Sequence, residues 1–302
     1  MKDVHAMAPA QDRLMLHRVG VSEIKKPISV QRPDRIITLS ATFAVAVDLP
    51  SHRKGSDLSR NAELLAEIVD QTVTRPVSSL ESACSEIARE LLVRHTYATE
   101  ASVRAEAEYF LRRGISEDRR SFENYQLFAG AHASRPDSGV VQVTQSIGAE
   151  AIGMTACPCA METAREKLTI EFPLLADPSL RDLPIITHNQ RNRTRLDFEA
   201  TDPVAVEADM MLDAIEHAQS SPTYAILKRG DEAQVVLDAH RSPKFVEDVV
   251  RDLLASLPDR FPNLPDAVVV QVQTVSEESI HKYNVEAAHH TSMGDLRKRA
   301  RP

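Results

Sequence analysis

The sequence contains no tryptophan, only 4% aromatic residues and three cysteines, and its formal net charge is −8 at pH 7. A nucleic-acid-binding surface normally shows a basic stripe or a platform of aromatic rings, so this composition argues against nucleic acid as a partner. Three cysteines cannot all pair with one another, which favours a reducing compartment. We therefore expect a cytoplasmic protein whose cysteines are free for chemistry or metal binding.

Long apolar segments are also missing. The longest run, near residues 41–47, is far short of the ~20 apolar residues that a membrane-spanning helix requires. Charged residues interrupt the beginning of the chain, so no stretch there has the apolar core of a secretory signal. The sequence predicts no membrane segment and no secretion.

The 302 residues, with 42% apolar and 26% charged positions, have the composition of a globular protein with one large or two medium domains. A long stretch rich in proline and aspartate, residues 172–184, looks like an insertion. The first ~20 residues and residues 297–302 carry charge without periodic apolar positions, so we expect disordered ends.

Apolar periodicity predicts strands and helices over most of the chain. Alternating apolar residues predict a long half-buried strand at residues 35–49. Further strands are expected at residues 101–111, 122–131, 140–154, 193–201, 232–239 and 267–275. Helices are expected at residues 61–73, 78–95, 160–172, 204–219 and 244–257. The two halves of the chain look like loose repeats of strands interrupted by a helix pair.

Two cysteines stand in a compact turn that leaves a predicted strand and enters a predicted helix. The segment reads Gly153-Met154-Thr155-Ala156-Cys157-Pro158-Cys159. With Cys84 as the only other cysteine, a four-cysteine zinc site is excluded. On this pattern alone, an inert buried pair and a metal-binding or reactive pair both remain open.

A second segment, residues 184–193, surrounds His188 with hydrogen-bonding side chains. So many polar groups just before a predicted strand indicate a site, although loops on protein surfaces are commonly polar. Residues 221–232, 244–248 and 279–281 carry further polar side chains that are not specific individually. Acidic residues at a helix start, for example, usually complement the helix dipole.

Taken together and in this order, these segments resemble the GTP cyclohydrolase IB family and its archaeal relatives, the GTP cyclohydrolases of the methanopterin pathway. The resemblance covers most of the chain, and its most specific points are the G-M-T-x-C-P-C turn and the T-H-N-Q-R loop. Less specific points are Gly20-Val21, Lys25-Lys26-Pro27-Ile28, Lys54-Gly55 and Ser59-Arg60. The long separation of Cys157 from His188 resembles the archaeal branch. Asp57 and Leu58 depart from the family, which often has a histidine in this segment.

The resemblance implies an α+β tunnelling fold with two β-sheet and helix-pair units, at residues 31–155 and 156–285. An N-terminal arm at 1–30 and a C-terminal tail at 286–302 would flank them. It also implies a homo-oligomer, a dimer or tetramer, that forms a barrel with sites at subunit boundaries.

The function that the resemblance implies is a GTP cyclohydrolase, which opens the imidazole ring of GTP and releases formate. The archaeal branch implies 7,8-dihydroneopterin 2′,3′-cyclic phosphate and diphosphate as products, at the first step of methanopterin biosynthesis. The alternative product is 7,8-dihydroneopterin triphosphate. Alternatives from other classes are a tunnelling-fold oxidoreductase and a non-catalytic nucleotide-binding or metal-storing module.

The resemblance assigns Cys157, His188 and Glu232 to a metal ion, and Cys157 is also assigned to catalysis. Adding water at C8 of the purine needs an activated water, which a divalent metal supplies by lowering the pKa of a bound water. The archaeal relatives imply iron(II), while mixed sulfur, nitrogen and oxygen ligands leave zinc and manganese open. Cys159 is expected to support the site or to be structural.

Other residues are assigned to the substrate by the same resemblance. Glu247 would accept the adjacent N1–H and N2–H₂ donors of guanine. His281 would be a general acid and base, because imidazole titrates near neutrality. The phosphates require concentrated donors, and the candidates are Lys54, Arg60, Arg191, Arg193, Lys228 and Arg229. His217 and His240 are expected to be structural.

Overall fold

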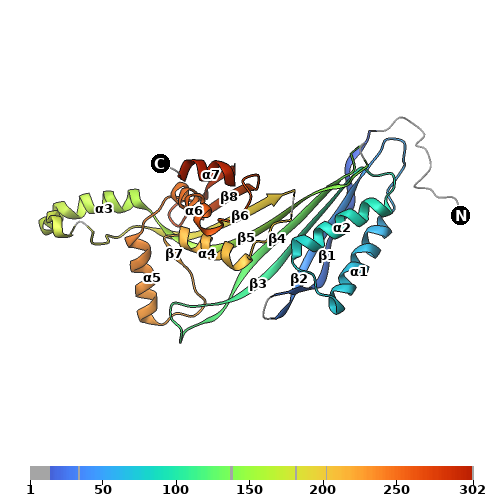
Figure 1. The fold of residues 1–302 in the computed structure, drawn as a ribbon. Helices are drawn as coiled ribbons and strands as arrows, with labels where there is room; N and C mark the ends of the chain where they lie inside the picture. The colour runs from blue at the N-terminus through green and yellow to red at the C-terminus, as the bar shows by residue number, and fades with distance from the viewer. Residues whose placement is uncertain (1–13, 33–34, 137–138, 181, 202, 301–302) are drawn as a thin grey trace. The chain divides into compact units, whose positions relative to one another are not determined.

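The computed structural model describes residues 14–32, 35–136, 139–180, 182–201 and 203–300 (Figure 1). Contacts within it define two compact units. The N-terminal unit comprises the described residues up to Tyr109 together with those in Gln126–Gly148 and Glu199–Ala205. The C-terminal unit comprises those in Phe110–Tyr125, Ala149–Phe198 and from Val206 onward. Because this division is not a single cut in the sequence, the predicted boundaries at residues 31, 156 and 286 stay predictions.

The strands that the structure describes are hydrogen-bonded in the order β1-β2-β3-β4-β5-β6-β8-β9, with β7 on β5. Their bounds are β1 Leu16–Gln31, β2 Ile36–Leu49, β3 Glu100–Arg113, β4 Ser121–Ser134, β5 Gln142–Ala156, β6 Asn189–Ala200, β7 Ser221–Pro222, β8 Val269–Glu277 and β9 Val285–Ser292. The α-helices are α1 Leu58–Thr74, α2 Leu80–Arg94, α3 Pro158–Glu171, α4 Ala208–Ala218, α5 Arg229–Arg241, α6 Val246–Arg260 and α7 Met293–Ala300. The pairs β1–β2, β2–β3, β5–β7 and β8–β9 are antiparallel, which confirms the α+β class.

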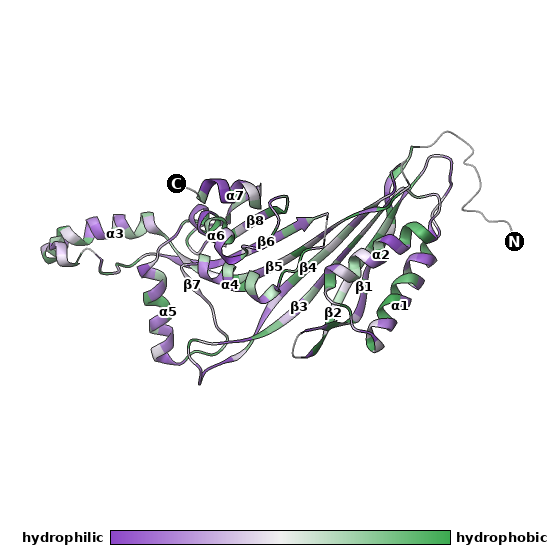
Figure 2. Ribbon diagram, viewed as in Figure 1, coloured by the Kyte–Doolittle hydropathy of each residue, from purple (hydrophilic) through white to green (hydrophobic). Residues whose placement is uncertain are grey.

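The core of the N-terminal unit lies between strands and a helix pair. Alternate residues of β2, such as Phe43 and Val45, are fully buried, as the strand pattern predicts. Helix α1 contacts β1, and α2 contacts both α1 and β2. Apolar residues recur between polar ones along both helices in Figure 2, which is the pattern of helices that bury one face.

The core of the C-terminal unit forms around α4 and α6, which contact each other. Met211 and Leu212 of α4 and Leu253 and Leu257 of α6 have no exposed surface. These helices carry apolar residues at helical spacing, so their predicted positions are confirmed. None of the helices in the described ranges is long and apolar enough to cross a membrane.

One predicted strand is wrong. Residues 232–239 belong to the helix α5, in which Asp231, Val235 and Ala239 are buried at intervals of one helical turn. The backbone N–H of Lys228 donates to Asp231 Oδ2 at 2.9 Å and so fixes the start of the helix. The adjacent apolar residues in this segment fit either period, and the tertiary contacts select the helix.

The predicted disorder of the chain ends is wrong where the structure describes them. Leu16 begins β1, whose residues pair with β2 as far as Gln31. Most of β1 is exposed or half-buried, so it lacks a strong apolar alternation in sequence. Residues 297–300 form the last turn of α7, in which Leu296 is buried. Residues 1–13 and 301–302 lie outside the described residues.

A buried polar network joins the two helices of the N-terminal unit. His95 is fully buried after α2, and its Nε2 lies 2.6 Å from Asn61 Oδ1 on α1. Its Nδ1 lies 2.9 Å from Tyr97 Oη, which also contacts Ser56 Oγ at 2.7 Å. Since Asn61 Oδ1 only accepts, Nε2 donates, and in the neutral ring Nδ1 accepts from the Tyr97 hydroxyl. Burial, together with the charge of Arg60, lowers the pKa of His95 and favours this form.

We predict that acid weakens the fold through His95. In the unfolded chain His95 takes up a proton below its ordinary pKa of about 6.5, whereas the folded chain resists protonation until a lower pH. The contribution of His95 to the free energy of unfolding is therefore complete above about pH 6.5, the pKa in the unfolded chain. It decreases as the pH falls from there toward the lower pKa of the folded chain. Urea unfolding at about pH 8 and pH 5.5 should show a steeper loss for the wild type than for His95→Gln, which cannot titrate. Equal losses in the two proteins would contradict this account.

Candidate active site

Cys157 occupies the turn between β5 and α3. It is the N-cap residue of α3, and its Sγ accepts a hydrogen bond from the backbone N–H of Ala160 at 3.4 Å. Pro158 suits the first helical position, because its missing N–H has no partner to lose there. The N–H groups at the start of a helix favour a negatively charged group, so the turn suits a thiolate ligand. Cys157 is half-buried and Cys159 is exposed.

The His188 loop lies directly against this turn. The backbone N–H of Cys157 donates to His188 O at 3.1 Å, and Thr187 Oγ1 donates to Cys157 O at 2.8 Å. The two most specific segments of the sequence, far apart along the chain, are thus joined by hydrogen bonds. The thiol of Cys157 and the imidazole of His188 are therefore presented by adjoining pieces of backbone.

The His188 side chain is 13% exposed, and its Nδ1 faces two acceptors. Gln190 Oε1 lies 3.0 Å away and Glu278 Oε2 lies 3.6 Å away. With Nδ1 turned toward these oxygens, Nε2 is the nitrogen that can bind another group. Metal-ligating histidines commonly have this arrangement, with one nitrogen held by the protein and the other on the metal.

Glu278 was missed by the sequence reasoning. It begins the loop between β8 and β9, and its side chain is 9% exposed, which is unusual for a carboxylate. The available signal was a Glu-x-x-His spacing that ends at His281, a few residues after a predicted strand. His281 itself is exposed and stacks on Tyr283, with ring centroids 4.9 Å apart and planes inclined by 8°.

The segment before α6 is also joined to the turn. The backbone N–H of Lys244 donates to Ala156 O at 3.0 Å, directly before Cys157. Glu247 lies in the first turn of α6, a few residues further on, with its side chain exposed. The residue expected to recognise guanine thus belongs to a segment hydrogen-bonded to the Cys157 turn.

Glu232 is not brought into a ligand cluster with Cys157 and His188 within one chain. It is exposed in the first turn of α5. No group of three or more His, Cys, Asp or Glu residues within the described ranges could hold a metal ion. The structure therefore joins the backbones of two of the three expected ligands, and the described residues form no three-ligand group.

The candidate phosphate-binding cations differ in how they are engaged. Arg193 pairs with Glu150 at 3.3 Å and Glu277 at 3.4 Å, so its charge is partly matched. Arg60 pairs with Asp57 at 3.3 Å. The remaining candidates have exposed side chains, and they are Lys54, Arg191, Lys228 and Arg229.

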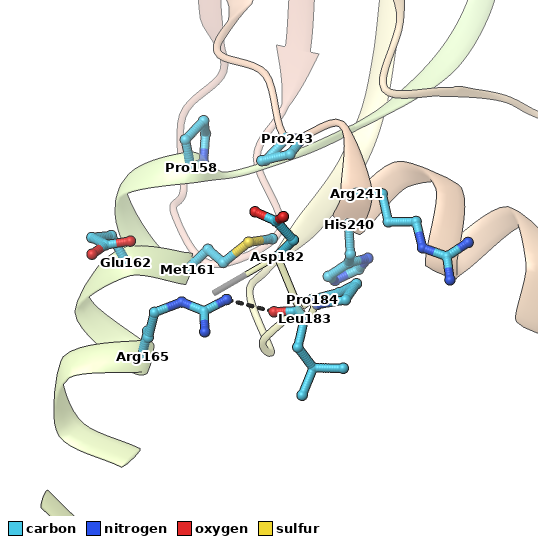
Figure 3. A pocket seen from close by; sticks show the side chains of 10 residues that line it. All are labelled: Pro158, Met161, Glu162, Arg165, Asp182, Leu183, Pro184, His240, Arg241 and Pro243. Atoms are coloured by element: carbon cyan, nitrogen blue, oxygen red, sulfur yellow. Dashed lines mark hydrogen bonds between the residues drawn. The ribbon is translucent and has the colours of Figure 1, made fainter. Parts of the chain in front are cut away.

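A pocket of about 770 Å³ is lined in part by Pro158, the residue that follows Cys157 in the sequence. Figure 3 shows it between α3 and the end of α5, with Asp182, Leu183 and Pro184 between them. Arg165 of α3 donates to Leu183 O at 2.5 Å and so ties the predicted insertion to the helix. His240, expected to be structural, lines the pocket; its Nδ1 lies 2.8 Å from Val236 O of its own helix. The volume lies in the range of about 300–1,000 Å³ that is typical of small-molecule sites.

We predict that the three thiols react in a fixed order in the metal-free protein. Cys84 is fully buried, and desolvation with a smaller contribution from Glu81 raises the pKa of its thiol. Brief alkylation followed by mass spectrometry should label Cys159 first, Cys157 more slowly, and Cys84 only after unfolding. Labelling of Cys84 in the folded protein at the rate of Cys159 would contradict the structure.

Solved structures with the same architecture define the fold class. A uricase from Bacillus fastidious superposes with a TM-score of 0.52 at 13% identity, covering 97% of this chain and 98% of the uricase. A uricase from Arthrobacter globiformis gives 0.51 at 8% identity, with 94% and 96% covered. At these identities the likeness shows the fold alone, and it supports the tunnelling-fold assignment.

Relatives in sequence are much closer. The GTP cyclohydrolase MptA of Methanosarcina mazei is 42% identical over 308 aligned positions, which cover 99% of this chain and 96% of the relative. The GTP cyclohydrolase MptA of Methanothermobacter thermautotrophicus is 39% identical, with 93% and 91% covered. The sequence model described as type I GTP cyclohydrolase folE2 matches residues 1–287. The chain belongs to this GTP cyclohydrolase family, and it is an enzyme.

Proposed function

We propose that the protein hydrolyses GTP at the imidazole ring and releases formate, using a metal ion held by Cys157 and His188. The observation that carries the proposal is the pair of hydrogen bonds between the Cys157 turn and the His188 loop. They hold the backbone of Cys157 beside that of His188 in a chain whose relatives are named GTP cyclohydrolases.

The donor set fits a divalent metal. Cys157 offers a half-buried sulfur at a helix start, and His188 has Nδ1 directed at protein acceptors, which leaves Nε2 as a ligand atom. When bound, the metal would supply an activated water for attack at C8 of the purine. Following the archaeal resemblance, we propose iron(II) as the metal. Zinc and manganese are the alternatives, because this set of donor atoms does not select one metal.

Glu232 is proposed as the carboxylate ligand, contributed by a second copy of the chain. Within one chain, the described residues form no three-ligand cluster, and Glu232 is exposed on α5. A homo-oligomer that places α5 of one copy against the Cys157 turn of another would complete the set. This arrangement agrees with the oligomeric barrel implied by the resemblance.

The remaining roles follow the chemistry of the substrate. Glu247 would accept the N1–H and N2–H₂ of guanine from the start of α6, whose preceding segment is hydrogen-bonded at Ala156. His281 would transfer protons during ring opening and rearrangement, because its imidazole is exposed and can exchange protons with solvent. The exposed cations Lys54, Arg191, Lys228 and Arg229, together with Arg60 and Arg193, are the proposed phosphate donors.

For the product, we propose 7,8-dihydroneopterin 2′,3′-cyclic phosphate with diphosphate, at the start of methanopterin biosynthesis. The proposal follows the archaeal-type spacing of the two motifs and the similarity to relatives named MptA. Dihydroneopterin triphosphate is the alternative.

The test is an anaerobic incubation of metal-stripped protein with GTP, with and without iron(II), zinc or manganese. We expect formate, the cyclic phosphate and diphosphate with iron(II), measured by mass spectrometry. Cys157→Ser and His188→Ala should each lower kcat/KM by at least about 100-fold, because each removes a ligand to the catalytic ion. Cys159→Ser is the matched control, and it should stay within about threefold of the wild type, since its thiol is exposed and outside the ligand set.

Three other outcomes would contradict the proposed product, the proposed activity or the proposed ligand. Formation of dihydroneopterin triphosphate would replace the proposed product by the alternative. No formate with any metal, in protein that is folded and binds GTP, would refute the proposed activity. Equal losses in Cys157→Ser and Cys159→Ser would contradict the assignment of the ligand.

A further inference from the structure

A line of buried polar side chains lies behind His188. Gln190 on β6 donates from Nε2 to Thr155 Oγ1 on β5 at 3.2 Å, and Thr155 Oγ1 lies 3.2 Å from Ser276 Oγ on β8. Thr155 and Ser276 have no exposed surface, and Gln190 is 9% exposed. Three strands thus contribute one hydrogen-bonded chain that ends on the ring of His188. Buried polar groups of this kind are costly unless every member has a partner.

The tautomer of His188 depends on the direction of these hydrogen bonds and on the nearby carboxylate of Glu278. A hydroxyl can donate or accept, so Thr155 and Ser276 alone would permit either orientation of the Gln190 amide. Glu278 removes this ambiguity, because its carboxylate lies 3.6 Å from the same Nδ1 and attracts an N–H while repelling a lone pair. The carboxylate therefore favours a proton on Nδ1, with Gln190 Oε1 accepting and Gln190 Nε2 donating to Thr155.

We propose that Gln190 is a positioning residue that, together with the Glu278 carboxylate, holds His188 as the Nδ1–H tautomer, and that the Thr155 hydroxyl supports this orientation by accepting from the Gln190 amide. The neutral ring then presents the lone pair of Nε2 to an electron-pair acceptor such as a divalent metal ion. The consequence for metal binding rests on the proposed function, whereas the tautomer is a property of the metal-free chain.

The same face of β6 supplies a matched control. Gln190, Asn192 and Thr194 alternate along the strand and are all buried. Asn192 Nδ2 donates to Thr194 Oγ1 at 3.1 Å and to Thr274 Oγ1 at 2.7 Å. Gln219 Nε2 also donates to Thr194 Oγ1, at 2.8 Å. This second cluster has the same chemistry and burial, but none of these hydrogen bonds involves His188.

The experiment compares Thr155→Val with Thr194→Val, each of which replaces a fully buried hydroxyl by a methyl group of similar size. Long-range ¹H–¹⁵N NMR of metal-free, histidine-labelled protein at about pH 8.5, where imidazole is neutral, reports the tautomer. The signals of His188 are identified by their loss in His188→Gln. We expect the Nδ1–H tautomer in the wild type and in Thr194→Val, and a mixture of tautomers in Thr155→Val. Thr155→Ser restores the hydroxyl and should restore the single tautomer.

A second readout is the dissociation constant of zinc or iron(II), measured by competition with a chromogenic chelator. Loss of an outer partner of a ligating histidine typically weakens binding about 10- to 100-fold, so we expect this change in Gln190→Leu and a smaller loss in Thr155→Val, which acts through Gln190. Thr194→Val should bind as the wild type does. Ser276→Ala, which deletes the far end of the chain with a smaller disturbance, should give a smaller loss in the same direction.

The Nε2–H tautomer in the wild type, or a Thr155→Val protein equal to Thr194→Val in tautomer and metal binding, would overturn the inference. Failure of the proposed function is separable from this result. The expected tautomer in a protein that releases no formate from GTP would contradict the function alone. Formate release by a protein with the opposite tautomer would contradict the inference alone.

Discussion

Two hydrogen bonds join the turn at Cys157 to the loop at His188, and the arrangement of the candidate site depends on them. Both use backbone atoms of Cys157, so they hold the turn without the Cys157 thiol, although one of them needs the hydroxyl of Thr187. The segment before α6 adds a third bond to the adjacent carbonyl of Ala156. Turns that change direction at the end of a strand leave backbone groups without ladder partners, and here the neighbouring loops satisfy them. The candidate ligands Cys157 and His188 therefore lie on backbone segments that the sheet holds in place.

The interior beside the site is polar. On β6, buried glutamine, asparagine and threonine replace the apolar residues that a buried strand face normally carries. Room for this network is made elsewhere: a Cβ at Gly153 would lie 2.4 Å from Gln219 Cγ, so glycine is required in the turn motif for close packing. The amide of Gln219 then reaches Thr194 and Asn192. Gly153, which belongs to the Cys157 sequence motif, thus leaves room for the side chain of Gln219.

Much of this could be predicted from sequence because the signals are local. The alternation in β2 and the helical spacing in α1, α2, α4 and α6 predict their elements within a few residues. The strand prediction for residues 232–239 was wrong because the apolar residues of this segment are adjacent and fit either period. The burial of Val235 and Ala239 on one helix face could be seen only in the structure. The edge strand β1 is mostly exposed and lacks the required alternation. Residue types identified Cys157 and His188 as candidates, but no sequence pattern states that Glu278 and Gln190 meet the same ring nitrogen, since those contacts depend on strand order and register.

The central claim is that Cys157 and His188 form the metal-binding pair of a GTP-hydrolysing enzyme. The most direct measurement is the absorption spectrum of the metal-stripped protein after loading with cobalt(II), because a thiolate bound to cobalt gives an intense charge-transfer band that oxygen and nitrogen ligands do not give. The account predicts this band in the wild type and in Cys159→Ser, and its loss in Cys157→Ser. A band that persists in Cys157→Ser, or disappears in Cys159→Ser, would contradict the assignment on which the proposed chemistry depends.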